Sequence, residues 1–193
     1  MSSPDTVRFP AEDRERRKWM DPEAILARIG VKQGTIFADI GCGGGFFALP
    51  AARIVGYNGR VLGVDRDVRS VNAVLESASK EKLDNLQLAA GRAEDIVLCS
   101  HCADVVFFGM DLHDFDDASA VLRNARKTIK PSGILVNLDW KKETMRFGPP
   151  LEKRFDEEKA KKLIEGAGFA VESISGSGPF HYLILATPLP ANK

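Results

Sequence analysis

A glycine-rich stretch that follows an acidic residue is the part of the chain best suited to chemistry. Asp39 ends an apolar run, and Gly41, Gly43 and Gly45 follow it at alternate positions. Glycine is needed where the backbone takes a positive φ or approaches a ligand closely. A turn of this kind after a strand places a nucleotide-like ligand over the amino end of the next helix. Asp65 ends a second apolar run, and its two carboxylate oxygens suit the vicinal hydroxyls of a ribose.

The glycine spacing separates two classes of cofactor. Enzymes that bind dinucleotides carry G-x-G-x-x-G, and here Phe46 occupies the third glycine position. The actual pattern is an acid, an apolar residue and G-x-G-x-G, which resembles motif I of the class I S-adenosylmethionine-dependent methyltransferases. The resemblance implies S-adenosyl-L-methionine as the cofactor. It places the following residues at the binding turn: Asp39, Gly41, Cys42, Gly43 and Gly45.

Three later segments strengthen this resemblance. In the family, the acid after the second strand binds ribose and its neighbour flanks adenine, which implies these roles for Asp65 and Arg66. The segment 91–95 resembles the family's Gly-Asp-Ala-Glu-Asp, in which the alanine N–H reads the adenine edge. Here Arg92 replaces the aspartate, so recognition would rest on Ala93, with Glu94 as a weak substitute. A solvated charged loop is the alternative. Residues 130–133 match a Lys-Pro-Gly-Gly turn, and residues 36–140 resemble the ubiquinone/menaquinone-type small-molecule methyltransferases.

The residues after the fourth expected strand are candidates for catalysis. Gly109 would let the chain pass under the methionine moiety of the cofactor. Asp111 and His113 are the candidate bases, needed only if the acceptor must lose a proton. The alternative is that Asp114 caps a helix at 116–129 and His113 is a loop residue. Residues 141–154 are expected to form either a substrate lid, with its lysines and Arg154 favouring an anionic acceptor, or a solvated connection.

The elements that must position these residues alternate between strands and helices. Apolar periodicity predicts helices at about 46–55, 68–82 and 116–129, a fifth strand at 134–140, and a closing hairpin of strands near 169–175 and 180–187. This layout indicates an α/β, Rossmann-like methyltransferase fold. We expect a seven-stranded, mostly parallel sheet of order 3-2-1-4-5-7-6, with an antiparallel terminal strand and helices on both faces. We expect one domain over 1–193, in which 1–30 is an N-terminal helical extension and 31–193 the sheet core.

Composition argues against several functional classes. The 27 basic and 27 acidic residues give a formal net charge of zero, so no overall field attracts nucleic acid. We therefore expect a small-molecule acceptor and no nucleic acid or membrane partner. Residues 1–6 lack the features of a secretory signal, and three cysteines are too few for a disulfide framework. These features favour a cytoplasmic protein with reduced cysteines. Cys99 and Cys102 have a metal or redox spacing, but no second pair completes a zinc site, so we expect no metal.

Three other functions stay open at this level. Methylation of a nucleic acid or a protein is opposed by the neutral charge and by the lack of an added recognition domain. A nicotinamide-dependent oxidoreductase would also use an acid at Asp65, although Phe46 and the closing hairpin oppose it. A non-catalytic module that binds an adenosyl ligand would keep the same fold, and Arg92 at the adenine-reading position is compatible with it.

Overall fold

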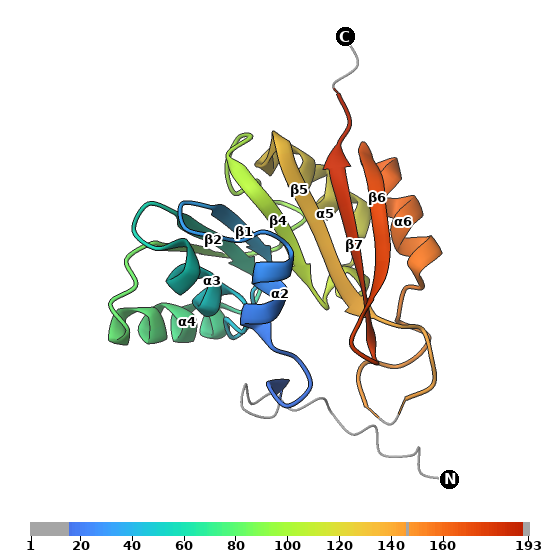
Figure 1. Ribbon diagram of the computed structural model, residues 1–193, viewed down its shortest axis with the longest axis horizontal. Coiled ribbons are helices and arrows are strands. Elements are labelled where there is room, and N and C mark those ends of the chain that lie inside the picture. The colour runs from blue at the N-terminus through green and yellow to red at the C-terminus, as the bar shows by residue number, and fades with distance from the viewer. Residues whose placement is uncertain (1–15, 146, 191–193) are drawn as a thin grey trace.

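A seven-stranded sheet forms the centre of the computed structural model, which describes residues 16–145 and 147–190 (Figure 1). The strands lie in the order β3-β2-β1-β4-β5-β7-β6. The first five strands in this order are parallel to one another, whereas β7 runs antiparallel to both β5 and β6. The predicted fold class and strand order are therefore confirmed. The strands are β1 (Ile36–Ile40), β2 (Arg60–Asp65), β3 (Leu86–Ala90), β4 (Ala103–Gly109), β5 (Ile129–Trp140), β6 (Phe169–Ser177) and β7 (His181–Pro188).

Four of the helices begin at an aspartate whose side chain accepts a hydrogen bond from a first-turn N–H, which satisfies one otherwise unpaired donor. These helices are α2 (Pro22–Arg28), α4 (Val68–Lys80), α5 (Ala118–Thr128) and α6 (Glu157–Gly166), capped by Asp21, Asp67, Asp117 and Asp156. The helix expected at 116–129 is thus capped by Asp117, so the assignment of that role to Asp114 was wrong. Helix α3 (Ala48–Val55) has no side-chain cap and follows the glycine-rich turn directly.

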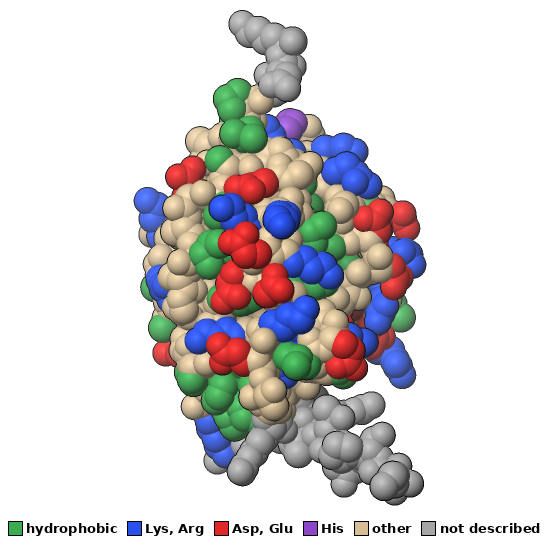
Figure 2. Space-filling view, turned by 90° about the vertical axis from the view of Figure 1, so that its right-hand side faces the viewer, with side chains coloured by type: hydrophobic (Ala, Val, Ile, Leu, Met, Phe, Trp, Pro, Cys, Tyr) green, Lys and Arg blue, Asp and Glu red, His purple; other side chains and the backbone are tan. Residues whose placement is uncertain are grey.

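The strands of the sheet centre are buried on both faces, as expected for a parallel sheet covered by helices. In β4, Val106 and Phe108 pack with α5 and α6, whereas Val105 and Phe107 pack with α2 and α3. Helix α4 contacts α3 through a smaller cluster. The outer face over α6 and β6 carries acidic and basic side chains close together (Figure 2).

Strand β5 is longer than the sequence predicts. It begins at Ile129 and includes the segment 130–133, which was expected to be a turn. Lys130 Nζ lies 2.6 Å from Asp104 Oδ1, so this extension is joined to the first residues of β4 by an ion pair.

Several expectations concern the amino-terminal region. The first half of the predicted extension, and the segment 1–6 examined for a secretory signal, lie outside the described residues. Residues 22–28 are helical, as predicted. In the part of the chain that the structure covers, none of the helices has the length and apolarity that crossing a membrane requires.

Candidate functional site

A cavity of about 190 Å³ lies at the carboxyl ends of β1, β2, β3 and β4. This is where open α/β sheets bind their ligands, because the crossover helices leave a crevice there. The parallel register aligns these ends, since Asp39 pairs with Gly63 and Phe107. The walls are formed by Gly41, Val64, Asp65, Arg66, Gly91, Arg92, Ala93, Glu94, Asp111, Asp114, Phe115 and Asp116.

The glycine-rich turn is held against β2 by its backbone. The N–H groups of Gly41 and Cys42 both donate to the Val64 carbonyl, at 2.8 and 3.0 Å. Gly41 and Gly45 have φ of 75° and 83°, in the left-handed region that favours glycine. A Cβ at Gly45 would also lie 3.0 Å from the methyl groups of Val74, so glycine allows α4 to pack closely behind the turn.

Asp65 is held in place by two backbone donors. Gly43 N–H donates to its Oδ2 and Asp67 N–H donates to its Oδ1, both at 2.8 Å. Each carboxylate oxygen can accept more than one hydrogen bond, so both retain acceptor capacity beside the cavity. The side chain is therefore an oriented, two-oxygen acceptor at the end of β2.

Two further carboxyl groups are buried close to Asp65, where each disfavours ionisation of its neighbours. Asp39 is 2% exposed, and burial, with the Asp65 charge as the second cause, raises its pKa to about 7. Asp111 occupies the space that a Cβ at Gly41 would need. Both of its carboxylate oxygens are buried, and neither has a hydrogen-bond partner among the described residues. Burial, followed by the charges of Asp39 and Asp139, raises the Asp111 pKa well above its usual range. A ligand cation would favour ionisation of these groups.

The backbone before Asp111 adopts an unusual conformation. Met110 has φ of 72°, which non-glycine residues rarely adopt, and its N–H donates to the Leu138 carbonyl at 2.7 Å. Such outliers persist only when the surrounding structure stabilises them, and they cluster at functional sites.

His113, the second candidate base, lies behind the cavity wall. It is 7% exposed in the short 3-10 helix η1 (Leu112–Asp114), and its Nδ1 is 2.7 Å from Asp139 Oδ1. Burial lowers the pKa of His113. The hydrogen bond and the charge of Asp139 raise this pKa by more than burial lowers it, so the net shift is upward. The expectation of a plain loop residue was therefore wrong. Sequence reasoning missed Asp139, although an acid inside the apolar run 134–140 is a signal that could have found it.

The wall beside β3 is charged at its rim and tied to α5 at its base. Arg92 donates to Asp116 Oδ2 at 3.1 Å and lies 3.5 Å from Glu94 Oε1. Asn124 Nδ2 donates to the carbonyl oxygens of Ala93 and Glu94, at 3.0 and 2.7 Å. Arg92 thus neutralises acids on the rim, while the backbone of the wall is fixed by a single amide from α5.

Six residues of the sequence prediction do not line the cavity: Asp39, Cys42, Gly43, Gly45, Gly109 and His113. Cys42 is 5% exposed and packs against β2, where its Sγ would lie 3.3 Å from a Cβ at Gly63. Gly109 packs between aromatic rings, since a Cβ there would lie 3.1 Å from Phe47 and 3.0 Å from Phe107. Cys42 thus packs the glycine-rich turn against β2, and Gly109 lets the end of β4 pack against the two rings.

Arg154 holds together the segment 141–154, which was expected to be either a lid or a solvated connection. Its side chain is buried, and its guanidinium donates to the backbone carbonyls of residues 141, 143, 147 and 149. These hydrogen bonds fold the segment 141–154 onto itself. They leave the guanidinium committed to the loop, which does not support a role for Arg154 in attracting an anionic acceptor.

The cysteines differ from the expectation of an entirely reduced chain. Cys99 and Cys102 form a disulfide in the connection between β3 and β4, whereas Cys42 is free and buried. The expectation was therefore wrong for this pair. The spacing of three residues permits such a bond, but the number of cysteines alone argued against it.

Comparison with known proteins agrees with this site. Residues 31–173 match the family described as "Methyltransferase domain". The chain belongs to this methyltransferase family. The resemblance predicted from the glycine spacing is confirmed at this level.

Solved structures share the fold over most of this chain. A crystal structure of an S-adenosylmethionine-dependent methyltransferase from Aquifex aeolicus has 28% sequence identity and a TM-score of 0.85, and the match covers 90% of this chain and 93% of that one. The [4+2]-cyclase SpnF matches with a TM-score of 0.72 and 16% identity, over 89% of this chain and 81% of its own. The methyltransferase fold thus also occurs in a protein named for another reaction, so fold alone does not fix activity.

Curated relatives share a shorter segment. The demethylmenaquinone methyltransferase of Geobacillus kaustophilus (strain HTA426) is 28% identical over 135 residues, which is 70% of this chain and 56% of that protein. The chain therefore spans little more than half the length of this methyltransferase.

Proposed function

We propose that this chain is an S-adenosylmethionine-dependent methyltransferase that acts on a small-molecule acceptor. When bound, the cofactor supplies a methyl group on a positively charged sulfur. The observation that carries the proposal is the cavity itself. It is lined by Asp65, a fixed ribose-type acceptor, and by Asp111 beside the glycine turn, a buried carboxylate with no hydrogen-bond partner among the described residues. A nucleoside that carries a cation fits both features.

The residues present suit such a cofactor. Asp65 would accept from the ribose hydroxyls, Arg66 would flank the adenine, and the Ala93 backbone would read its edge. Gly41 and Asp111 would face the charged end. The other residues proposed at the site act on the turn or the wall: Asp39, Cys42, Gly43, Gly45, Arg92, Glu94 and Gly109.

Asp111 and His113 receive different roles in this proposal. Asp111 lines the cavity and balances the positive charge of the cofactor. His113 does not line it, and its Nε2 lies 3.6 Å from Asp114 Oδ2, which does. A proton lost by the methyl acceptor would therefore reach His113 only through Asp114 in the cavity wall. Asp139 would stabilise the imidazolium that forms.

The class of acceptor is supported by charge and by relatives. Acidic and basic side chains alternate on the face over α6 and β6, which offers no single-sign surface for nucleic acid there (Figure 2). The relatives named demethylmenaquinone methyltransferases act, by their name, on a small molecule. We also propose a single domain over 1–193 and a cytoplasmic location.

Binding calorimetry tests the cofactor assignment. We expect S-adenosylmethionine to bind and NAD⁺ to give no heat, and D65N to weaken binding while D84N, an exposed acid outside the cavity, leaves it unchanged. Methyl transfer is then measured with radiolabelled cofactor and the small-molecule fraction of a cell extract. Tight binding of NAD⁺, or equal affinity of the wild type and D65N, would refute the assignment.

A further inference from the structure

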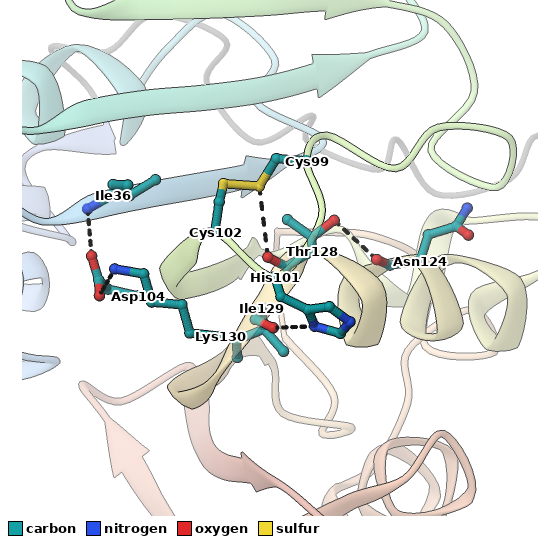
Figure 3. The surroundings of a disulfide bond; sticks show 9 residues. All are labelled: Ile36, Cys99, His101, Cys102, Asp104, Asn124, Thr128, Ile129 and Lys130. Carbon is teal, nitrogen blue, oxygen red and sulfur yellow. Dashed lines mark hydrogen bonds and ion pairs between the residues drawn. A yellow bond between two sulfur atoms is a disulfide. The ribbon is translucent and has the colours of Figure 1, made fainter. Parts of the chain in front are cut away.

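The disulfide directly precedes the first residue of β4, at the opposite end of the sheet from the cavity. Figure 3 shows the turn that carries it, which is also held by contacts other than the sulfur bond. His101 N–H donates to the Lys127 carbonyl at 2.8 Å, and Cys102 N–H donates to the Thr128 carbonyl at 2.9 Å. His101 Nδ1 also lies 3.0 Å from the Ile129 carbonyl oxygen. Because these contacts involve no sulfur atom, they can hold the two cysteines near one another after reduction.

The reduced form has a hydrogen-bond acceptor already in place. Cys99 Sγ lies 3.7 Å from the Thr128 carbonyl oxygen. In the disulfide this sulfur carries no proton, but as a thiol it can donate to that oxygen. The two cysteines are partly exposed, and Ser100 and His101 between them are exposed, so small reagents can reach the sulfur atoms. Both oxidation states therefore fit the same turn.

A short chain of contacts connects this turn with the wall of the cavity. Thr128, at the end of α5, donates from its Oγ1 to the Asn124 carbonyl at 3.0 Å, one helical turn earlier. Asn124 in turn holds the carbonyl oxygens of Ala93 and Glu94 (Figure 3 shows the α5 side of this path). The segment 93–102 is thus attached to α5 near both of its ends.

We propose that Cys99 and Cys102 are a reversible thiol–disulfide exchange site whose oxidation stiffens the cavity wall at Ala93 and Glu94. The oxidant is a low-molecular-weight disulfide such as glutathione disulfide. Two cysteine thiols lose their protons and two electrons to form the Cys99–Cys102 bond, and the glutathione disulfide is reduced to two molecules of glutathione. The third cysteine takes no part because Cys42 is buried.

Differential alkylation in glutathione buffers tests the exchange. With excess glutathione disulfide, we expect only Cys42 to be alkylated after denaturation. With excess reduced glutathione, we expect all three cysteines to be alkylated after denaturation and only Cys99 and Cys102 in the native protein. A pair that stays oxidised in excess reduced glutathione, or stays reduced in excess disulfide, would overturn the exchange. C42S should behave like the wild type at the pair.

Hydrogen exchange and cofactor binding test the coupling between the cysteine pair and the cavity wall. The binding measurement rests on the proposed function. We expect faster amide exchange over residues 91–98 in the reduced protein and in the C99S/C102S variant, and about fivefold weaker S-adenosylmethionine binding, at the low end of coupling between sites. N124A, which removes the link to Ala93 and Glu94, should abolish the difference in exchange between the oxidised and reduced forms.

Equal exchange over 91–98 in the oxidised and reduced forms would overturn the coupling. If no redox form binds the cofactor, the proposed function fails, whereas hydrogen exchange still decides whether the disulfide stiffens the wall.

Discussion

Replacement of Asp111 by Asn tests how the cavity recognises a positive charge. The substitution keeps the shape of the side chain and removes a charge that is buried without a hydrogen-bond partner in the described structure. Two opposite effects follow. The free protein should become more stable at neutral pH, because a buried carboxyl group whose ionisation the fold disfavours is lost. The cofactor should bind less tightly, because its cation loses a counter-charge.

The size of the binding effect follows from the charges. Two unit charges about 4 Å apart interact by about 4 kcal/mol at an effective dielectric constant of 20. Removing the ligand cation from water offsets about half of this, which leaves roughly 2 kcal/mol or about a 30-fold loss of affinity at pH 8. The loss should shrink as the pH falls, because Asp111 in the free wild-type protein is then protonated.

The folded pKa of Asp111 is raised above its unfolded value, so its ionisation destabilises the fold as pH rises through the folded pKa. D111N should therefore be more stable than the wild type at pH 8, and the two should converge near pH 4. Asp39, whose pKa is about 7, titrates in both proteins, so its contribution to the difference in stability between them cancels to first order.

Calorimetry in buffers of different ionisation enthalpy measures both consequences. The wild type should release protons when S-adenosylmethionine binds near neutral pH, and D111N should release fewer. Urea denaturation at pH 4 and pH 8 gives the stability difference. Equal proton release by the two proteins, together with equal affinity at pH 8, would show that Asp111 does not face the cation.

Three further predictions concern other parts of the site. D65A should weaken cofactor binding by at least about 30-fold, since hydrogen bonds to a charged group contribute about 1.5–3 kcal/mol each; calorimetry measures this, and unchanged affinity would contradict the ribose role. D139N should destabilise the protein by about 3 kcal/mol, as expected when a buried pair loses one partner. Because the folded pKa of His113 is raised, this penalty is fully present below the unfolded pKa of about 6.5 and declines as pH rises through the folded value. Urea denaturation at pH 6 and pH 9 checks that order. G45A should cost about 2 kcal/mol through strain and crowding, whereas G44A, where a Cβ meets no atom within 4 Å, should be nearly neutral in the same assay.

Local sequence patterns predicted the fold because the sheet is buried on both faces. The apolar runs that end in Asp39 and Asp65 mark β1 and β2, and the short glycine-rich link near Gly178 marks the antiparallel pair. The wall of the site was harder to predict, because its contacts join residues far apart in the chain. The hydrogen bond between His113 and Asp139, for example, spans 26 residues and depends on the pairing of β4 with β5.

Element ends were predicted less well, for a physical reason that the residues show. Periodicity indicates which face of a helix is apolar, but the first residue depends on which of several nearby acids bonds to the backbone. Asp114 was the expected cap, but Asp116 and Asp117 follow it closely, and it is Asp117 that accepts from Ala120 N–H. In the same way, nothing local distinguishes a turn at 130–133 from a strand until Ile129 pairs with Ala103.

The position of β7 between β5 and β6 has a consequence for how the molecule assembles. Strand β6 pairs only with β7, which is made after it, so β6 has no neighbour in the sheet until residues 181–188 have emerged from the ribosome. An unfinished chain would expose the free edge of β5 and an unpaired β6 together. The nascent protein is therefore most prone to aggregate just before its synthesis reaches this strand, and completion of the sheet is a late, concerted event.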